Sequence, residues 1–183
     1  KMNLIKTKID GLIILRPNII YDERGCFTET FNQSKIDELL GNINFVQENE
    51  SFSLKGVLRG LHFQKPPFAQ SKLVKCVKGC ILDVALDLRK DSKSYRQFEI
   101  TTLSDENKKQ LFIPKGFAHG FIVLSESAIL SYKVDNYYNH KAESGVIWND
   151  PDLKIDWKID KNQIIISEKD KSLPKLAEII NPF

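Results

Sequence analysis

Apolar residues along this chain gather in short runs that are separated by Gly, Pro, Asn and Asp. Each run is rich in Val, Ile, Leu and Phe and is shorter than a typical helix, and such runs between turn residues are typical of β-strands. We predict strands at residues 12–15, 57–63, 73–77, 81–88, 98–102, 111–113, 120–124, 128–134 and 145–148. The pattern therefore predicts an all-β protein.

Only one segment has a clear helical pattern. Ile36, Leu39 and Leu40 share one face of a helix, for which Ser34 is a candidate N-cap and Gly41 a candidate C-terminal stop. Helices are therefore expected to be few and peripheral. So many strands in one domain must hide their edges by closing into a barrel or stacking as a sandwich, and a jelly roll does both.

The size of the chain favours a single domain. Its 183 residues, 42% of them hydrophobic, suffice for one core and are few for two. We expect one domain over residues 1–183. Lys1 stands before what looks like an initiator Met2 and is expected to be a cloning remnant, and neither a leader segment nor a membrane span is predicted.

The formal net charge of +3 is too small to indicate a nucleic-acid-binding protein. Cationic residues gather instead between Ser51 and Leu82, a segment without acidic residues in which His62 can exchange protons near neutral pH. The cations of this segment are Lys55, Arg59, Lys65, Lys72, Lys75 and Lys78. The segment therefore predicts a site for a small anionic ligand, such as a phosphorylated substrate of acid-base chemistry.

The three cysteines, Cys26, Cys76 and Cys80, are odd in number. They also lack partners at the spacing of a zinc site. We therefore expect reduced thiols and a cytosolic, that is cytoplasmic, protein.

Each histidine can be judged from its neighbours. His62 lies on a predicted strand with Gln64 on the same face, which places both in a barrel interior. His119 follows Gly116 in a turn before a strand and is expected at a barrel mouth, whereas His140 lies in a polar loop. A histidine in a β core is more often structural than catalytic, so spacing alone leaves both roles open for His62 and His119.

The segments around His62 and His119 are similar to the two halves of the metal site of cupin proteins, which needs a further His and a Glu. Gln64 stands in place of the second histidine, and no acidic residue follows before Asp83. No metal is therefore predicted. A metal-dependent cupin oxygenase stays as an alternative that elemental analysis would test.

A specific resemblance rests on a series of motifs in one order. They are Gly56-Val-Leu-Arg-Gly-Leu-His62-Phe-Gln, Pro67-x-x-Gln70-x-Lys72-Leu-Val, Asp83-Val-Ala-Leu-Asp87-Leu-Arg89, Ile113-Pro-x-Gly-Phe-Ala-His119-Gly-Phe, Tyr132-Lys133, Tyr137-Tyr138, Trp148-Asn-Asp-Pro151 and Ser167-Glu-Lys-Asp170. Together they resemble the dTDP-4-dehydrorhamnose 3,5-epimerase family over residues 24–170. The resemblance implies a metal-free cupin jelly roll that acts as a homodimer, exchanges N-terminal strands and epimerises a nucleoside-diphosphate 4-keto sugar without a cofactor.

The same resemblance implies a catalytic set. His62 would be the base, Asp170 its orienting carboxylate, Lys72 the stabiliser of an enolate oxygen and Tyr132 the acid on the opposite ring face. These residue types suit the chemistry, because carbons 3 and 5 both flank the ketone at carbon 4, and loss of either hydrogen gives an enolate on that oxygen. Without the resemblance, Asp170 reads as a surface residue, Lys72 as solvated or phosphate-binding, and Tyr132 as a core aromatic.

The resemblance also implies contacts to the substrate. Guanidinium and ammonium groups suit the diphosphate, while amides and aromatic rings suit the base. Arg24, Phe27 and Glu29 are expected from the other subunit, and Asp83 and His119 from around Lys72 and the keto sugar. The substrate-binding residues are thus Arg24, Phe27, Glu29, Gln47, Asn49, Arg59, His119, Tyr138, Lys169 and Asp83. Their alternative roles are rim salt bridges, core packing and solvated strand positions.

The chain departs from the family pattern at three places. Residues 94–97 lack the usual glycine, Cys80 replaces an aliphatic residue, and Asp135 follows the strand of Tyr132. The substrate therefore stays open between a dTDP-linked deoxyhexose and a GDP-linked 4-keto-heptose of capsule or lipopolysaccharide synthesis, and between inversion of both carbons or of one. A non-catalytic sugar-nucleotide-binding cupin is the alternative of another class.

Overall fold

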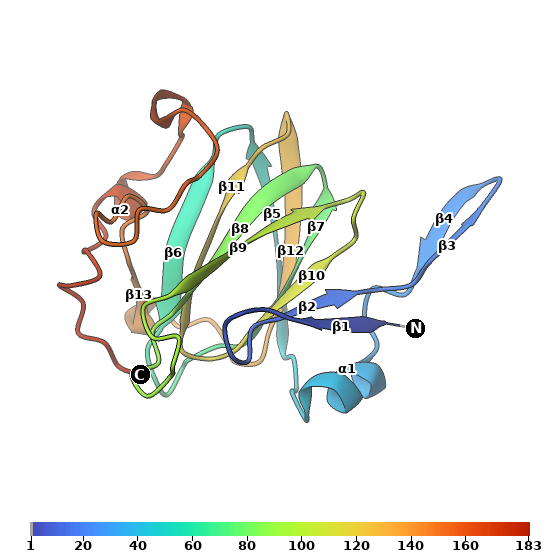
Figure 1. Cartoon of the computed structure of the whole chain (residues 1–183), viewed down its shortest axis with the longest axis horizontal. Helices are drawn as coiled ribbons and strands as arrows, with labels where there is room; N and C mark the ends of the chain where they lie inside the picture. Colours follow the sequence, from blue (N-terminus) through green and yellow to red (C-terminus); the bar gives the residue numbers. More distant parts are fainter. Residues whose placement is uncertain (1) are drawn as a thin grey trace.

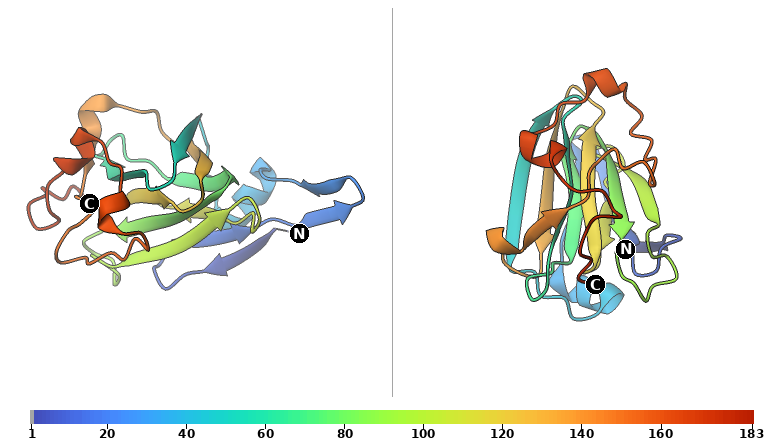
Figure 2. Two further views of the ribbon diagram at one scale, coloured as in Figure 1. Left: turned by 90° about the horizontal axis from the view of Figure 1, so that it is seen from above. Right: turned by 90° about the vertical axis from the view of Figure 1, so that its left-hand side faces the viewer.

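Two antiparallel β-sheets, packed face to face, form the body of the protein (Figures 1 and 2). They are seen in a computed structural model that describes residues 2–183. Lys1, the expected cloning remnant, lies outside the described residues. The arrangement is the all-β jelly roll that the sequence predicts, with short helices at its periphery.

Consecutive strands of the jelly roll cross from one sheet to the other. In spatial order, the six-stranded sheet consists of β1 (Asn3–Lys6), β2 (Ile13–Arg16), β10 (Gln110–Ile113), β7 (Lys72–Lys78), β12 (Ser127–Val134) and β5 (Gln47–Leu54). The five-stranded sheet consists of β13 (Glu143–Gly145), β6 (Leu58–Gln64), β11 (Phe117–Val123), β8 (Cys80–Asp87) and β9 (Phe98–Ser104). The steps from β5 to β6, β7 to β8 and β11 to β12 each change sheet, so short stretches of sequence supply both walls of the barrel.

Apolar side chains from both sheets meet between them. Val74, Leu111 and Leu130 project from the six-stranded sheet, and Ala85 and Phe121 project from the five-stranded sheet into the same buried cluster. All five are buried. Because each fully buried side chain of this kind contributes about 1.5–3 kcal/mol, this cluster holds the two sheets together.

The C-terminal segment covers the outer face of the five-stranded sheet (Figure 2). Trp157 and Leu176 from this segment are buried against Leu86 and Ile122 of the sheet. Both faces of the sheet are therefore covered, and β8 and β11 are buried along almost their whole length. This explains why their sequences read as continuous apolar runs and not as an alternation.

An N-terminal hairpin extends away from the body (Figure 1). Its strands, β3 (Ile19–Asp22) and β4 (Gly25–Thr28), pair with each other and form a separate two-stranded sheet. Ile20, Tyr21 and Phe27 are exposed on this hairpin. A two-stranded hairpin is marginally stable by itself, and among residues 2–183 neither strand joins one of the two large sheets.

The predicted strands all overlap strands of the structure, although 145–148 meets β13 at Gly145 alone. Four strands were missed. β5 reads as mostly polar because its outward face carries Glu48 and Glu50, and β1, β3 and β4 contribute little to the core.

The predicted helix is α1 (Gln33–Leu40), but Ser34 is not its N-cap. Asn32 caps it instead, because its side chain accepts the backbone N–H of Lys35 at 3.3 Å. Three further short helices were missed, which are η1 (His140–Ala142), η2 (Lys161–Gln163) and α2 (Glu168–Lys171). Among residues 2–183, none of the helices has the length and apolar character that crossing a bilayer requires.

Candidate active site

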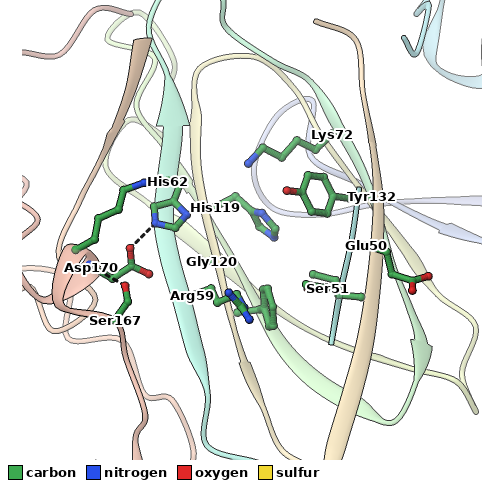
Figure 3. Close-up of a pocket in the computed structure, with 13 residues that line it drawn as sticks. Glu50, Ser51, Arg59, His62, Lys72, His119, Gly120, Tyr132, Ser167 and Asp170 are labelled. Carbon is green, nitrogen blue, oxygen red and sulfur yellow. Dashed lines mark hydrogen bonds and ion pairs between the residues drawn. The ribbon is translucent and has the colours of Figure 1, made fainter. Parts of the chain in front are cut away.

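A cavity inside the barrel has two adjoining lobes of about 300 Å³ each. His62 on β6, Lys72 on β7 and Tyr132 on β12 line both lobes, so these three side chains mark the place where the lobes meet. Figure 3 shows His62 on one side of the cavity and Lys72 and Tyr132 on the other. The cavity also contains Gln64, as expected from its position on the same strand face as His62.

His62 is paired with a buried carboxylate. Its Nε2 lies 2.7 Å from Oδ1 of Asp170 on α2, and Oδ2 of Asp170 accepts the backbone N–H of Gly60 at 3.0 Å. The Ser167 hydroxyl caps α2 by accepting the N–H of Asp170 at 3.1 Å. The cap therefore fixes the start of a one-turn helix, which in turn places the carboxylate behind the imidazole (Figure 3).

This pairing determines which nitrogen of His62 can act as a base. Burial raises the pKa of Asp170, but hydrogen bonds from His62 and Gly60 outweigh burial and hold the pKa below its ordinary value. An ionised carboxylate only accepts hydrogen bonds, so the His62 proton lies on Nε2 and its Nδ1 carries the free lone pair. Nδ1 points into the cavity (Figure 3).

Lys72 and Tyr132 present their polar ends to the cavity from the opposite sheet (Figure 3). The Lys72 Nζ lies 5.8 Å from the centre of the Tyr132 ring. Burial lowers the pKa of Lys72 to about 8, and the charges of Asp83 and Glu143 offset part of that effect. Burial also raises the pKa of Tyr132, so at pH 7 the amine is charged and the phenol keeps its proton.

His119 lies within a strand and not in the turn before it, where the sequence analysis placed it. It lies within β11, directly opposite His62 in the register, and is 7% exposed. Its Nε2 is 2.8 Å from Oδ2 of Asp83 on β8. The predicted turn is present at Lys115 and Gly116, but the strand after it begins at Phe117 and not at residue 120, so it includes His119.

Asp83 and His119 differ in their access to the cavity. Asp83 is fully buried and is not among the residues that line the two lobes, whereas His119 lines the first lobe. The role of Asp83 around the substrate stays a prediction.

The predicted nucleotide contacts divide between the lobes. Arg59 and Lys169 line the first lobe, and Gln47, Asn49 and Tyr138 line the second. The Gln47 amide bridges the other two, because it donates to Asn49 Oδ1 at 2.8 Å and accepts the Tyr138 N–H at 3.1 Å. Cationic groups and amide groups thus occupy different lobes of one cavity.

Arg24, Phe27 and Glu29 are not brought to the cavity of their own chain. Arg24 and Phe27 lie on the β3–β4 hairpin, Glu29 follows it, and the Phe27 side chain is 70% exposed. Arg24 pairs with Asp22, and Glu29 pairs with Lys35. Their position outside the body agrees with the expectation that another subunit would receive them.

Glu143 on β13 is a cavity residue that sequence reasoning missed. It lines the second lobe, accepts the Tyr138 hydroxyl at 2.8 Å and accepts the Lys169 ammonium at 2.7 Å. Burial raises the pKa of Glu143, but these two hydrogen bonds outweigh it and lower the pKa. The only sequence signal was an acid a few residues after Tyr138, which is no stronger than a solvated loop position.

The histidines and carboxylates of the cavity do not form a metal site. Within residues 2–183, no group of three or more His, Cys, Asp and Glu side chains could hold a metal ion. His62 and His119 each pair with a different carboxylate instead. The chemistry that this arrangement supports is proton transfer by an imidazole on one side of a ligand and a phenol on the other.

Comparison with known proteins agrees with this geometry. The sequence model of the family described as dTDP-4-dehydrorhamnose 3,5-epimerase matches residues 6–178. The chain belongs to the dTDP-4-dehydrorhamnose 3,5-epimerase family. The enzyme of that name from Escherichia coli K12 is 48% identical over 180 residues, which cover 98% of this chain and 97% of that protein.

Solved structures of this epimerase family match the whole fold. The 3,5-epimerase of Legionella pneumophila, solved in complex with dTDP-4-keto-L-rhamnose, has a TM-score of 0.94 at 47% identity and covers 98% of this chain and 95% of its own. The epimerase of Bacillus anthracis, solved with TDP and pyrophosphate, has a TM-score of 0.92 at 45% identity and covers 96% of this chain and 100% of its own. The resemblance that the motifs indicated is therefore confirmed over nearly the entire chain.

Proposed function

We propose that the protein inverts carbons 3 and 5 of a dTDP-linked 4-keto-6-deoxyhexose. The observation that carries this proposal is the placement of the His62–Asp170 pair on one side of a single cavity and of Tyr132 and Lys72 on the other. The protein is thus an isomerase, as are its 48% identical relatives that carry the name dTDP-4-dehydrorhamnose 3,5-epimerase. The chemistry needs no cofactor.

The first step removes a proton next to the ketone. The free Nδ1 of His62 takes the hydrogen of carbon 3 or carbon 5, and the electron pair of the C–H bond moves to the carbon 4 oxygen as an enolate. The Lys72 ammonium stabilises that oxygen, and Asp170 stabilises the imidazolium that forms. A fixed cation at an oxyanion lowers such a barrier by about 3–4 kcal/mol.

The second step returns a proton from the opposite face. The Tyr132 hydroxyl donates its proton to the carbon, the enolate collapses to the ketone, and the centre is inverted. The phenol then regains a proton while the imidazolium loses one, so the enzyme returns to its starting state. Because both carbons flank the same ketone, one catalytic set serves carbon 3 and carbon 5 in turn.

The nucleotide is held at the outer part of the cavity. Arg59 and Lys169 bind the diphosphate, and Gln47, Asn49 and Tyr138 bind the base and its sugar. Glu143 joins these two groups, because it holds Lys169 and Tyr138 together. The charge of the cavity therefore matches a dianionic ligand with an aromatic base.

The working form that we propose is a homodimer of single-domain subunits. Arg24, Phe27 and Glu29 of each subunit would complete the nucleotide site of the other through the β3–β4 hairpin, whose apolar side chains are exposed. The unpaired thiols support a cytoplasmic location. The deoxysugar product would supply a surface polysaccharide such as capsule or lipopolysaccharide.

Deuterium exchange tests the proposal directly. The protein is incubated in deuterated water with a dTDP-linked 4-keto-6-deoxyhexose and, separately, with a GDP-linked 4-keto-heptose, and the exchanged positions are counted by NMR. We expect exchange at carbons 3 and 5 of the dTDP sugar. Exchange at a single carbon would indicate a single-carbon epimerase, a preference for the GDP sugar would overturn the substrate, and the absence of any exchange would indicate a binding protein.

A further inference from the structure

The loop that carries Tyr138 is not held by regular secondary structure. It runs over residues 135–139, between the end of β12 and the start of η1. Tyr137 and Tyr138 are 64% and 53% exposed, so packing of their rings in the core does not hold the loop. Among residues 2–183, no backbone–backbone hydrogen bond involves residues 136–138. Such a loop is mobile unless other groups hold its backbone.

Gln64 on β6 holds the backbone on both sides of Tyr138. Its Nε2 donates to the Tyr137 carbonyl oxygen at 3.2 Å and to the Phe68 carbonyl oxygen at 2.7 Å. Its Oε1 accepts the Asn139 N–H at 2.7 Å. Gln64 is 6% exposed, so water competes little for these hydrogen bonds. One buried amide therefore fixes the residue before Tyr138 and the residue after it.

Two further glutamines hold neighbouring groups of the same loop. Gln47 on β5 accepts the Tyr138 N–H at 3.1 Å through its Oε1. Gln70, which lies just before β7, donates from its Nε2 to the Asn136 carbonyl oxygen at 2.7 Å. Side-chain amides from three segments thus give the loop the hydrogen bonds that a sheet gives to a strand.

The hydroxyl of Tyr138 is held from the strand next to Gln64. Glu143 pairs with Gln64 across β13 and β6, and it accepts the Tyr138 hydroxyl at 2.8 Å. His62 precedes Gln64 by two residues on β6 and also lines the second lobe of the cavity. The strand that carries the proposed base therefore also holds the loop of the second lobe.

We propose that Gln64 is a positioning residue that holds Tyr138 in its nucleotide-binding place before a ligand arrives. This inference rests on the proposed function, in which Tyr138 binds the base. A loop that is already ordered loses little conformational freedom on binding, so more of the contact energy appears as affinity. Gln64 stands where the metal site of cupins has its second histidine, so this chain uses that position to order a binding loop.

Amide hydrogen exchange tests the order of the loop in the wild-type protein without a ligand. The Tyr138 and Asn139 N–H groups donate to Gln47 and Gln64. NMR should therefore show both groups exchanging more slowly than in an unstructured peptide, by about ten-fold or more. Exchange at the rate of an unstructured peptide would overturn the proposal whether or not any Gln64 variant folds.

Gln64→Met tests the consequence for binding, because methionine keeps the length of the side chain and removes its hydrogen bonds. We expect the Asn139 N–H to lose its protection. The dissociation constant of dTDP, measured by calorimetry, should rise about ten-fold. The KM should rise while kcat changes little, because the proposed acid and base are untouched, whereas a general loss of structure would lower kcat as well.

Gln33→Met is the matched control. The Gln33 amide also holds a loop carbonyl, that of Ile43 at 2.8 Å, but Gln33 does not line either lobe of the cavity. The dissociation constant of dTDP should stay at the wild-type value in this variant. An unchanged dissociation constant in Gln64→Met, or an equal rise in both variants, would contradict the proposal.

A double-mutant cycle shows whether Gln64 acts through Tyr138. In a Tyr138→Ala background, Gln64→Met should cause almost no further loss of dTDP affinity, because the ring that it positions is already absent. Additive losses would overturn the proposal. These measurements need no turnover, so a failure of the epimerase function would be recognised separately, as dTDP binding without deuterium exchange into the sugar.

Discussion

The catalytic role proposed for His62 depends on a carboxylate that lies 108 positions further along the chain. Asp170 holds the proton on Nε2 and is itself kept ionised by two hydrogen bonds. The imidazole is therefore set in one tautomer before any ligand binds. This preorganisation is what separates a catalytic histidine from a structural one in a β core.

Replacing Asp170 by Asn tests that pairing. The amide keeps the shape of the side chain but removes the charge that stabilises the imidazolium, so kcat should fall by about 10² or more. Glu168→Gln is the control, because Glu168 lies on the same short helix and forms an exposed ion pair with Lys171. Steady-state kinetics and dTDP titration calorimetry check the result, and equal losses in both variants would contradict a special role for Asp170.

Tyr132→Phe separates the two proton transfers. The base His62 remains, so deuterium exchange next to the ketone should persist, while delivery from the opposite face and hence inversion should fall by about 10²-fold or more. NMR of the sugar in deuterated water measures exchange and configuration in one sample. Loss of both to the same extent would show that Tyr132 is not an acid alone.

The pKa of Lys72 predicts how the activity falls at high pH. Burial brings its pKa down to about 8, so the charged amine is present below pH 8 and is lost as the pH rises through that value. The kcat/KM should therefore decline above about pH 8. In Lys72→Arg the guanidinium stays charged, so the residual activity should not decline in this pH range. A decline at the same pH in that variant would show that another group causes it.

At the scale of elements, the site depends on the close approach of β6 and β11. Gly60 has φ +118°, and a Cβ there would lie 2.6 Å from the Gly120 Cα and 2.7 Å from the His119 carbonyl oxygen. Glycine at both positions lets the two backbones meet where His62 and His119 are paired. The packing of the strands therefore fixes the two histidines relative to each other.

Gly60→Ala should damage both stability and the site. Clash with backbone atoms adds to the strain of a positive φ, and together they should lower the free energy of unfolding by about 2–4 kcal/mol. Gly41→Ala is the matched control, since Gly41 also has positive φ but a methyl group added there would meet no atom within 4 Å. Urea denaturation followed by fluorescence compares the free energies of unfolding of the two variants. Equal losses of stability would show that the strain of the positive φ, and not the clash with backbone atoms, causes the effect.

At the scale of the whole molecule, the β3–β4 hairpin stands apart from the two large sheets. It carries two of the three residues expected in the nucleotide site of a second copy, and its apolar side chains are exposed. A cavity that is complete in its catalytic set but lacks these contacts is therefore consistent with exchange between two subunits.

Mixing two inactive variants tests the exchange. Arg24→Ala removes the residue given to the neighbour, and His62→Ala removes the base of the subunit's own cavity. Unfolding and refolding them together at equal amounts should restore about a quarter of wild-type activity, because about half of the dimers are mixed and each has one intact site. Each variant refolded alone is the control. No recovery in the mixture would mean that Arg24 acts on its own chain.

The sequence by itself determined the class of the fold and the types of residues that carry the chemistry. Short apolar runs between turn residues are a local property of the chain, so they predicted most strands and the all-β architecture. The ordered motifs likewise identified His62, Lys72, Tyr132 and Asp170 as a set. Local patterns failed where the strand was mostly polar, as in β5, and where one turn of helix carries Asp170.

The tertiary structure alone decided which groups act on one another. Glu143 meets Lys169, and Asp83 lies behind His119 without reaching the cavity, because strand register and the crossing between the two sheets bring them there. These contacts join positions that are far apart along the chain, and their hydrogen bonds and pKa shifts depend on distance and burial. Neither distance nor burial exists until the barrel has closed, so local patterns predicted residue types, the family resemblance supplied the pairing of His62 with Asp170, and the pairing of Glu143 with Lys169 was missed.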